Sequence, residues 1–343
     1  MNVKAWLNTV TSVSRTLPIV ILYVTEGCNL KCITCSYREA LPDELSLNEI
    51  ADLARALHSF GLRHIVYTGG EPLTRRDFSD ICRIFGAFKI KQTLLTNGLL
   101  LGKRFGEIHE SLSEIVVSLD GSTAETHNSI RGISSFDPII EGMKRAMSGS
   151  RRPQVSIRTV LQKRNFRDLL DMVHLAKSVG VDRISFLAAD VLSDSFGRTI
   201  RGSVAPDESI MLNHDEVTEF HSLVQNMMIT FKREFETKFI SESPEKMLHI
   251  VQYFEALLGK SAYPGNQCNA PMVSAVITST GDILPCFFLP SFGNIRKELL
   301  ETLINNDQIV STRTHVKNYS LERCQKCVCT LSVSPVTALF DRF

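Results

Sequence analysis

Three cysteines stand at short, regular intervals near the start of the chain. Cys28, Cys32 and Cys35 form a C-x3-C-x2-C pattern in the run TEGCNLKCITCSYR, directly after the apolar segment Ile19–Val24. Cysteine thiolates hold iron–sulfur clusters, four per cubane. Three thiolates leave one iron without a protein ligand, and an open metal position is where a cofactor or substrate binds. The spacing favours an iron–sulfur site, with ordinary loop thiols or part of a zinc site as the alternatives.

A second cysteine group lies near the other end of the chain. Cys268, Cys286, Cys324 and Cys327 are arranged C-x17-C, then a gap, then C-x2-C. Paired cysteines at comparable spacing are typical of zinc ribbons, so zinc is one interpretation of this group. In a large chain of this composition, nine cysteines indicate metal binding in a reducing cytoplasm rather than disulfides.

A glycine-rich turn follows the second apolar segment, His64–Tyr67. Its sequence is Gly69-Gly70-Glu71-Pro72. At this point the chain resembles the radical SAM superfamily, which pairs C-x3-C-x2-C after the first strand with a GGEP-type turn after the second. The resemblance implies that the three early cysteines hold a 4Fe–4S cluster whose open iron binds S-adenosylmethionine (SAM). It also implies that all four turn residues contact SAM.

Further SAM contacts are expected at later strand ends. Ser118 and Asp120, where the fourth strand ends, are candidate ribose or carboxylate contacts. Arg158 on the fifth strand is a candidate partner for the SAM carboxylate, and an ordinary surface arginine is the alternative. One position departs from the family, which usually has an aromatic residue just before the third cysteine. This chain has Thr34 there and Tyr37 after Cys35, so adenine stacking is expected to be weaker or supplied elsewhere.

The C-terminal group resembles the Twitch module, a shortened SPASM domain with one auxiliary 4Fe–4S cluster. The resemblance implies Cys268, Cys286, Cys324 and Cys327 as its ligands. Cys329 is expected to be inert, with exchange as a ligand as the alternative. A fully ligated cluster has no free iron for substrate, but it can accept or relay an electron. An electron acceptor near a substrate radical favours net oxidation over isomerisation.

The elements that must position these groups alternate between short β-rich runs and longer helical patterns. The expected strands are Val20–Val24, His64–Tyr67, Gln92–Thr96, Glu114–Leu119, Val155–Leu161 and Arg183–Leu187. The expected helices are Leu47–Phe60, Phe78–Phe85, Lys103–Ser111, Asp137–Met147 and Phe166–Ser178, then Glu216–Phe235 and Glu245–Leu258. Six β–α units predict an α/β fold, a partial (β/α)6 TIM-like barrel with functional groups at the C-terminal strand ends.

The chain divides into four parts. An amphipathic helix is predicted over 1–17, the barrel over 18–235, a helical linker over 236–262, and a small α+β iron–sulfur module over 263–343. The first helix should pack against the domain, with membrane-surface contact as the alternative. The irregular stretch 190–216 and the hairpin Met272–Phe288 are expected to control selectivity.

Composition limits the partners. With a net charge of +1 the chain carries no basic footprint for nucleic acid, and no apolar stretch is long enough to span a membrane. The cysteine usage indicates a cytoplasmic enzyme, and the resemblance to radical SAM enzymes implies an external electron donor such as flavodoxin or ferredoxin.

The predicted reaction is oxidation, by dehydrogenation or hydroxylation, of a small or medium-sized substrate. Peptide maturation and a non-catalytic iron–sulfur or zinc scaffold are the alternatives. No catalytic residue is predicted: His127, Arg131, Asp194 and Tyr263 are assigned no role in proton transfer.

Overall fold

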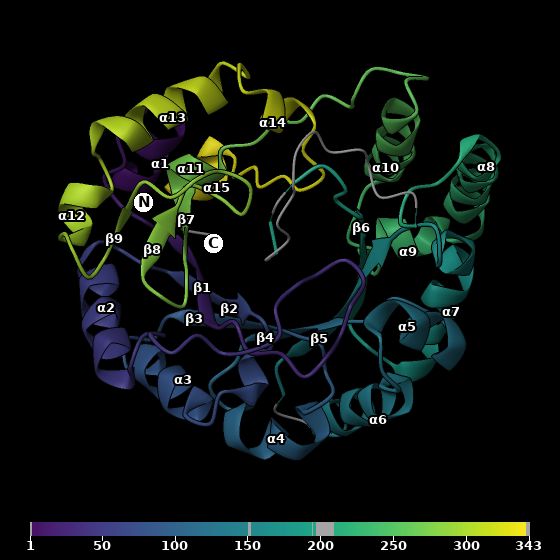
Figure 1. Ribbon diagram of the computed structural model, residues 1–343, viewed down its shortest axis with the longest axis horizontal. Helices are drawn as coiled ribbons and strands as arrows, with labels where there is room; N and C mark the ends of the chain where they lie inside the picture. The colour runs from purple at the N-terminus through teal and green to yellow at the C-terminus, as the bar shows by residue number, and fades with distance from the viewer. Residues whose placement is uncertain (1, 150–151, 194, 197–208, 341–343) are drawn as a thin grey trace.

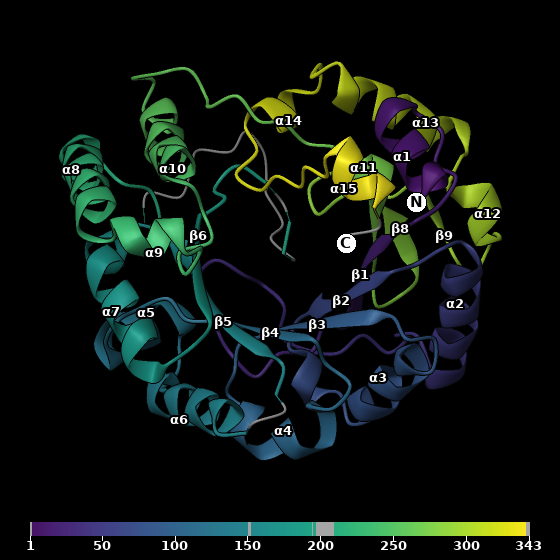
Figure 2. The ribbon, with the colours of Figure 1, turned by 180° about the vertical axis from the view of Figure 1, so that it is seen from behind.

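The computed structural model describes residues 2–149, 152–193, 195–196 and 209–340. Among these residues, one curved sheet has the strand order β6-β5-β4-β3-β2-β1-β7-β8-β9. Figure 1 shows the sheet bent into an arc, with helices along its outer side and the C-terminal helices closing much of the ring. Seen from behind, β1 to β6 line the inside of this ring (Figure 2).

The barrel strands run parallel to one another in sequence order. They are β1 (Ile19–Thr25), β2 (His64–Gly69), β3 (Lys91–Thr96), β4 (Glu114–Ser118), β5 (Gln154–Leu161) and β6 (Arg183–Ala188). All six were predicted within two residues of these bounds, and the parallel partial barrel is confirmed. In β1, Val20, Leu22 and Val24 enter the main core, so the alternate residues face the lumen.

The helices follow local signals in the chain. The outer helices are α2 (Leu47–Ser59), α3 (Phe78–Gly86), α4 (Leu101–Ile108), α5 (Ala124–Arg131), α6 (Phe136–Met147) and α7 (Leu169–Val179). They are followed by α8 (His214–Thr230), α9 (Lys232–Glu236) and α10 (Pro244–Leu257), and two 3-10 turns are η1 (Pro72–Thr74) and η2 (Phe166–Asp168). Ser46 and Glu49 form a reciprocal capping box that starts α2, and α7 ends at Gly180 in the left-handed region.

The C-terminal module continues the barrel sheet. Its strands are β7 (Ser274–Ile277), β8 (Asp282–Leu284) and β9 (Gly293–Asn294), and its helices are α11 (Ala270–Val273), α12 (Leu300–Leu303), α13 (Asp307–Lys317), α14 (Glu322–Gln325) and α15 (Pro335–Leu339). β7 pairs in parallel with β1, from Ile19 opposite Ser274 to Leu22 opposite Ile277. The sequence pattern gave no sign of this pairing, which joins the module rigidly to the strand that precedes the first cysteines.

The N-terminal helix differs from its prediction. α1 covers only Val3–Val10, because the Asn8 side chain donates to the carbonyls of Thr16 and Met272 and the chain folds back. Asn8 and Ala5 are buried, whereas Trp6 is 37% exposed and Val3 54% exposed. The small and polar residues of α1 therefore face the domain, and much of the predicted apolar stripe does not.

The core lies between the sheet and the outer helices. Cys82 on α3 is part of it and is fully buried, as its helical position predicted. No helix within the described ranges has the length and apolar character needed to cross a membrane. Much of the stretch 190–216, including Asp194, lies outside the described residues.

Candidate active site

The early cysteines follow β1 at the C-terminal edge of the barrel. Their loop is held by backbone hydrogen bonds from Cys28 N–H to the Arg38 carbonyl (3.0 Å), from Lys31 N–H to the Arg131 carbonyl (3.1 Å) and from Ile33 N–H to the Ile130 carbonyl (3.0 Å). The loop is thus fixed on one side by its own later residues and on the other by the end of α5.

Polar donors from other elements approach the thiols. Asn97, after β3, places its amide nitrogen 3.9 Å from the Cys28 sulfur. Arg131 places a guanidinium nitrogen 3.8 Å from the Cys32 sulfur. Burial raises the pKa of Cys28 and Cys35. Thiolates here need a cation to offset that burial, and nearby N–H donors are suited to cluster sulfurs, so the donor set fits an iron–sulfur cluster.

The GGEP turn packs directly against the backbone that leads to the cysteines. Gly70 N–H donates to the Thr25 carbonyl and Glu71 N–H to the Gly27 carbonyl, both at 2.8 Å. Gly69 has a φ of +119°, and a Cβ on Gly70 would overlap the Gly27 carbonyl oxygen. Only glycine permits so close an approach, which brings the ends of β1 and β2 together.

The Glu71 carboxylate is directed into the protein. It is fully buried and accepts hydrogen bonds from Leu73 N–H (3.0 Å), the Thr96 hydroxyl (2.7 Å) and Asn97 N–H (2.6 Å). Burial raises the pKa of this carboxyl group. The carboxylate ties the end of β2 to the end of β3, so any contact of the turn with SAM falls to its backbone.

The other three predicted SAM contacts, Ser118, Asp120 and Arg158, do not lie together in one place. Asp120 is buried, pairs with Arg131 at 2.7 Å and accepts from Val160 N–H at 2.9 Å, so its two oxygens are directed at the protein. Ser118 lies opposite Arg158 in the sheet register, so both side chains occupy the same face. Arg158 lines an interior cavity and donates to the Ser185 hydroxyl at 3.0 Å, which puts it inside the barrel.

That interior cavity gathers the C-terminal cysteines. Its volume is about 360 Å³, and its wall includes Cys268, Cys286, Cys324, Cys327 and Cys329. Much of the remaining wall is apolar, including Val276 and Phe288. Burial raises the pKa of Cys286 to about 12 and raises the pKa of Cys324 and Cys329. The four predicted thiols are brought together, and Cys329 joins them.

The thiols are not arranged around a point. Across the ranges that the structure describes, no three His, Cys, Asp or Glu side chains converge tightly enough to hold a single metal ion. A zinc ion needs its ligands at about 2.3 Å from one atom, whereas a cubane spreads its thiolates over four irons.

Aromatic side chains connect the two cysteine regions. Tyr37, after Cys35, meets Tyr23 of β1 edge-on with ring centroids 6.0 Å apart. Tyr23 in turn lies 6.1 Å from Phe287, which directly follows Cys286. Tyr37 thus packs toward the interior of the barrel, between the two sites.

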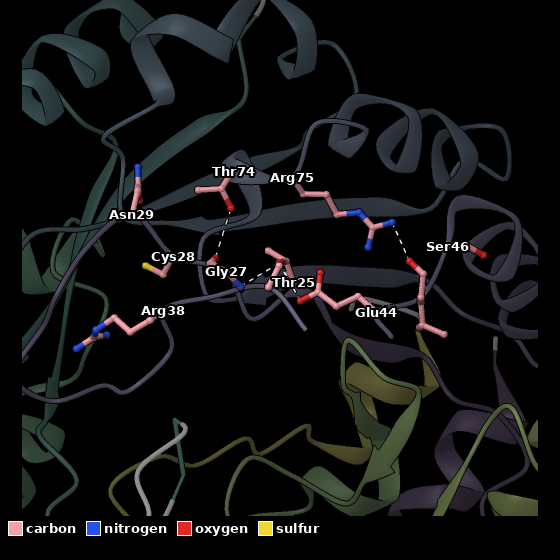
Figure 3. A pocket seen from close by; sticks show the side chains of 11 residues that line it. Thr25, Gly27, Cys28, Asn29, Arg38, Glu44, Ser46, Thr74 and Arg75 are labelled. Carbon is pink, nitrogen blue, oxygen red and sulfur yellow. Dashed lines mark hydrogen bonds between the residues drawn. The ribbon is translucent and has the colours of Figure 1, made fainter. Parts of the chain in front are cut away.

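An open pocket of about 510 Å³ flanks the early cysteine loop. Figure 3 shows Cys28 and Arg38 at one end of it and Glu44 and Arg75 at the other, with Thr25 between them. Glu44 accepts from the Thr25 hydroxyl (3.0 Å), and Arg75 donates to the Leu45 carbonyl (2.8 Å). These polar groups are already paired with one another and with the backbone around the cysteine loop. We therefore read the pocket as a depression beside the loop that these hydrogen bonds support.

Two site residues were missed from the sequence. Asn97 stood in a Thr-Asn-Gly run after a predicted strand, the position that favours function in barrels, but it received no role. Arg131 has no predicted role, because nothing in the sequence places the end of α5 against the cysteine loop.

Comparison with known protein families decides the assignment. Residues 22–183 match the model of the radical SAM superfamily, and residues 268–328 match SPASM, an iron–sulfur cluster-binding domain. The chain is a radical SAM protein with a SPASM domain. A radical SAM domain binds SAM and a 4Fe–4S cluster, and a SPASM domain binds auxiliary clusters.

Curated relatives of this radical SAM protein share modest identity. A probable GTP 3',8-cyclase from Sulfurisphaera tokodaii is 30% identical over 177 residues, which is 50% of this chain and 56% of the relative. A probable GTP 3',8-cyclase from Saccharolobus islandicus is 27% identical over 236 residues, covering 67% of this chain and 72% of the relative. The chain thus spans just over half the length of the first relative.

Solved radical SAM structures share the fold. Streptococcus suis SuiB bound to S-adenosylmethionine superposes with a TM-score of 0.62 at 17% identity, covering 94% of this chain and 74% of SuiB. Native anSMEcpe with bound AdoMet superposes with a TM-score of 0.64 at 19% identity, covering 90% of this chain and 87% of that one.

Proposed function

We propose that this radical SAM protein oxidises a small or medium-sized substrate in the lumen of its barrel. Cys28, Cys32 and Cys35 hold the SAM-binding cluster. The auxiliary cluster is held by the C-terminal cysteines other than Cys329, namely Cys268, Cys286, Cys324 and Cys327. When bound, SAM and its cluster supply a 5'-deoxyadenosyl radical that removes a hydrogen atom from the substrate.

The observation that carries this proposal is the joining of the two cysteine sites by one strand. β1 ends at the early cysteine loop, and its first four residues, Ile19–Leu22, pair with β7 of the module. The cavity with the late cysteines opens onto the lumen face of β1 and β2, through Ile21 and Val66. A substrate in the lumen would therefore lie between a radical source and an electron acceptor whose separation is fixed.

The chain's own residues orient SAM. The backbone of Gly69 and Gly70 lies beside the cysteine loop, where it can accept hydrogen bonds from the methionine amino group. Ser118 and Arg158 share a lumen-facing row, which offers a hydroxyl and a guanidinium to a carboxylate. Asp120 and Glu71 act indirectly, by fixing the strand ends.

Four thiolates at the auxiliary site favour oxidation. A cluster ligated fully by protein leaves no iron for substrate, so its role is to take an electron. The fifth thiol, Cys329, lies beside Cys327, whose sulfur donates to the Cys329 carbonyl at 2.7 Å. The initial electron for SAM cleavage comes from an external one-electron donor of low potential, such as flavodoxin or ferredoxin.

GTP is a second candidate substrate, because the curated relatives are probable GTP 3',8-cyclases. The cavity argues for a less charged molecule. The arginines in its wall are Arg158 and Arg323, and Arg323 donates to the Leu192 carbonyl at 2.9 Å. Burial lowers the pKa of His64, which also lines the cavity, to about 4, so this side chain adds no positive charge at neutral pH. A triphosphate needs several positive groups around it, and this wall is largely apolar.

The test is anaerobic reconstitution followed by iron, sulfide and 5'-deoxyadenosine assays with dithionite, with and without GTP. We expect about eight irons per chain, as two cubanes require, and nucleoside formation that GTP does not accelerate. Acceleration by GTP with a cyclised product would replace oxidation by the cyclase activity. Full iron loading without any nucleoside would favour a scaffold. Consumption of added peptides would favour a maturase.

A further inference from the structure

Arg131, the last residue of α5, is a largely buried cationic side chain beside the early cysteine loop. Its side chain is 11% exposed, and its guanidinium pairs with Asp120 at 2.7 Å and reaches the Cys32 sulfur at 3.8 Å. Its Nε is buried with no hydrogen-bond partner. A buried arginine with an unused N–H beside a metal-binding loop has donor capacity left for a group that occupies the loop.

The position of Arg131 is set by the backbone. The Arg131 and Ile130 carbonyls accept from Lys31 and Ile33, so the end of α5 and the cysteine loop form a short ladder. Gly132 ends the helix with a φ of +76°, and a Cβ there would overlap the Lys31 carbonyl oxygen. This contact requires glycine and keeps the guanidinium within reach of Cys32.

The anchoring carboxylate is fixed as well. Asp120 accepts from Val160 N–H at 2.9 Å, and its own N–H donates to His127 at 3.2 Å. Asp120 and Arg131 thus form a buried ion pair whose positive member faces the thiol. Because a planar guanidinium can bond a carboxylate and a sulfur at once, it is suited to both tasks.

A second arginine on the same loop offers a contrast. Arg38 is exposed, and its guanidinium donates to the backbone carbonyls of Cys32 (3.2 Å) and Cys35 (2.9 Å). Its charge is screened by solvent, whereas the charge of Arg131 acts through the protein interior. The two arginines carry the same charge but should affect the loop differently.

We propose that Arg131 is a positioning residue that raises the reduction potential of the SAM-binding cluster by donating to the thiolate of Cys32. Reduction adds one electron, taken from an external one-electron donor. A buried positive charge and an N–H···S bond both stabilise the reduced state. This inference rests on the proposed assignment of Cys32 as a ligand.

The test is an EPR-monitored potentiometric titration of the reconstituted full chain. Because Arg131→Met alone leaves Asp120 as a buried unpaired charge, the main variant combines Arg131→Met with Asp120→Asn. We expect the equilibrium constant for one-electron reduction of the SAM-binding cluster to fall about tenfold, or about 59 mV. Arg131→Lys retains the charge and loses the fork, so it should fall between this variant and the unchanged protein.

The matched control is Arg38→Met, for which we expect a smaller shift than for the paired variant. An unchanged potential in the paired variant, with normal iron content, would overturn the inference. So would an equal shift in Arg38→Met. A different result would show that the proposed function itself is wrong: the Cys32→Ala variant would then still hold the SAM-binding cluster. The auxiliary signal serves as an internal reference and should not move.

Discussion

The two cysteine sites of this protein are built in opposite ways. Cys28, Cys32 and Cys35 lie within one loop, and neighbouring elements supply polar donors such as Asn97 and Arg131. The later cysteines are drawn from the segment 268–329 and meet in a largely apolar cavity. One site is local in sequence, and the other is assembled from residues that lie far apart in sequence. Under the proposed function, this difference separates the site of radical generation from the site of electron acceptance.

The sharpest way to test this division is to remove the early thiols. Replacing Cys28, Cys32 and Cys35 by alanine together should abolish SAM cleavage, because three thiolates are the whole protein share of that cluster. About four irons should remain at the C-terminal site. Measurement of 5'-deoxyadenosine and iron in the triple variant checks both statements, and any residual SAM cleavage would refute the division.

The reverse experiment targets the closed site. Cys268→Ala or Cys327→Ala should remove about half of the iron and destabilise the module, because metal binding is coupled to folding. Cys329→Ala is the matched control, since this thiol lines the same cavity but is not proposed as a ligand. Iron analysis and thermal unfolding would distinguish them. Equal iron loss in Cys329→Ala would make it a ligand.

The close contact between the GGEP turn and the backbone that leads to the early cysteines can be tested with two glycine substitutions. Gly70→Ala places a methyl group on the Gly27 carbonyl and should cost about 1–3 kcal/mol of stability, with weaker SAM binding. Gly106→Ala lies in α4 with open space around it and should gain up to about 1 kcal/mol. Urea unfolding and SAM titration calorimetry check the pair. A Gly70→Ala protein that is as stable as Gly106→Ala would show that the junction is adjustable.

The smallest expected effect concerns His127. Its ring accepts a hydrogen bond from the backbone N–H of Asp120, the residue that pairs with Arg131 beside the early cysteines. Burial, aided by Arg131, lowers the pKa of His127 from 6.5 to about 3. Below pH 6.5 the unfolded chain takes up a proton that the folded chain does not, so stability falls as the pH falls. The expected slope is about 1.4 kcal/mol per pH unit from this residue, with the full contribution present above pH 6.5.

His127→Gln should show a shallower decline in unfolding free energy between pH 6.5 and 4 than the unchanged protein. Urea unfolding at several pH values measures both. Parallel curves for the two proteins would mean that His127 is free to protonate in the folded state.

The sequence predicted the six barrel strands within two residues of their bounds. This succeeded because β1 and its successors are short, strongly apolar runs. The assignment of the cysteines to two clusters rests on their spacing, which is a local property, and stays a prediction. The sequence was less successful for α1, where Asn8 rather than the apolar stripe is buried. A stripe of apolar residues indicates a buried face only when another element is available to cover it.

The amino-acid sequence alone determined the chemistry that is present: thiols at cluster spacing, a glycine turn and a parallel α/β barrel. Only the tertiary structure decided what each group faces. It directed Glu71 and Asp120 into the protein, turned Arg158 toward the auxiliary cysteines, and placed Arg131 against Cys32. The physical reason is that residue types and spacing are local, whereas contacts between α5 and the loop, or β1 and β7, depend on how distant segments pack.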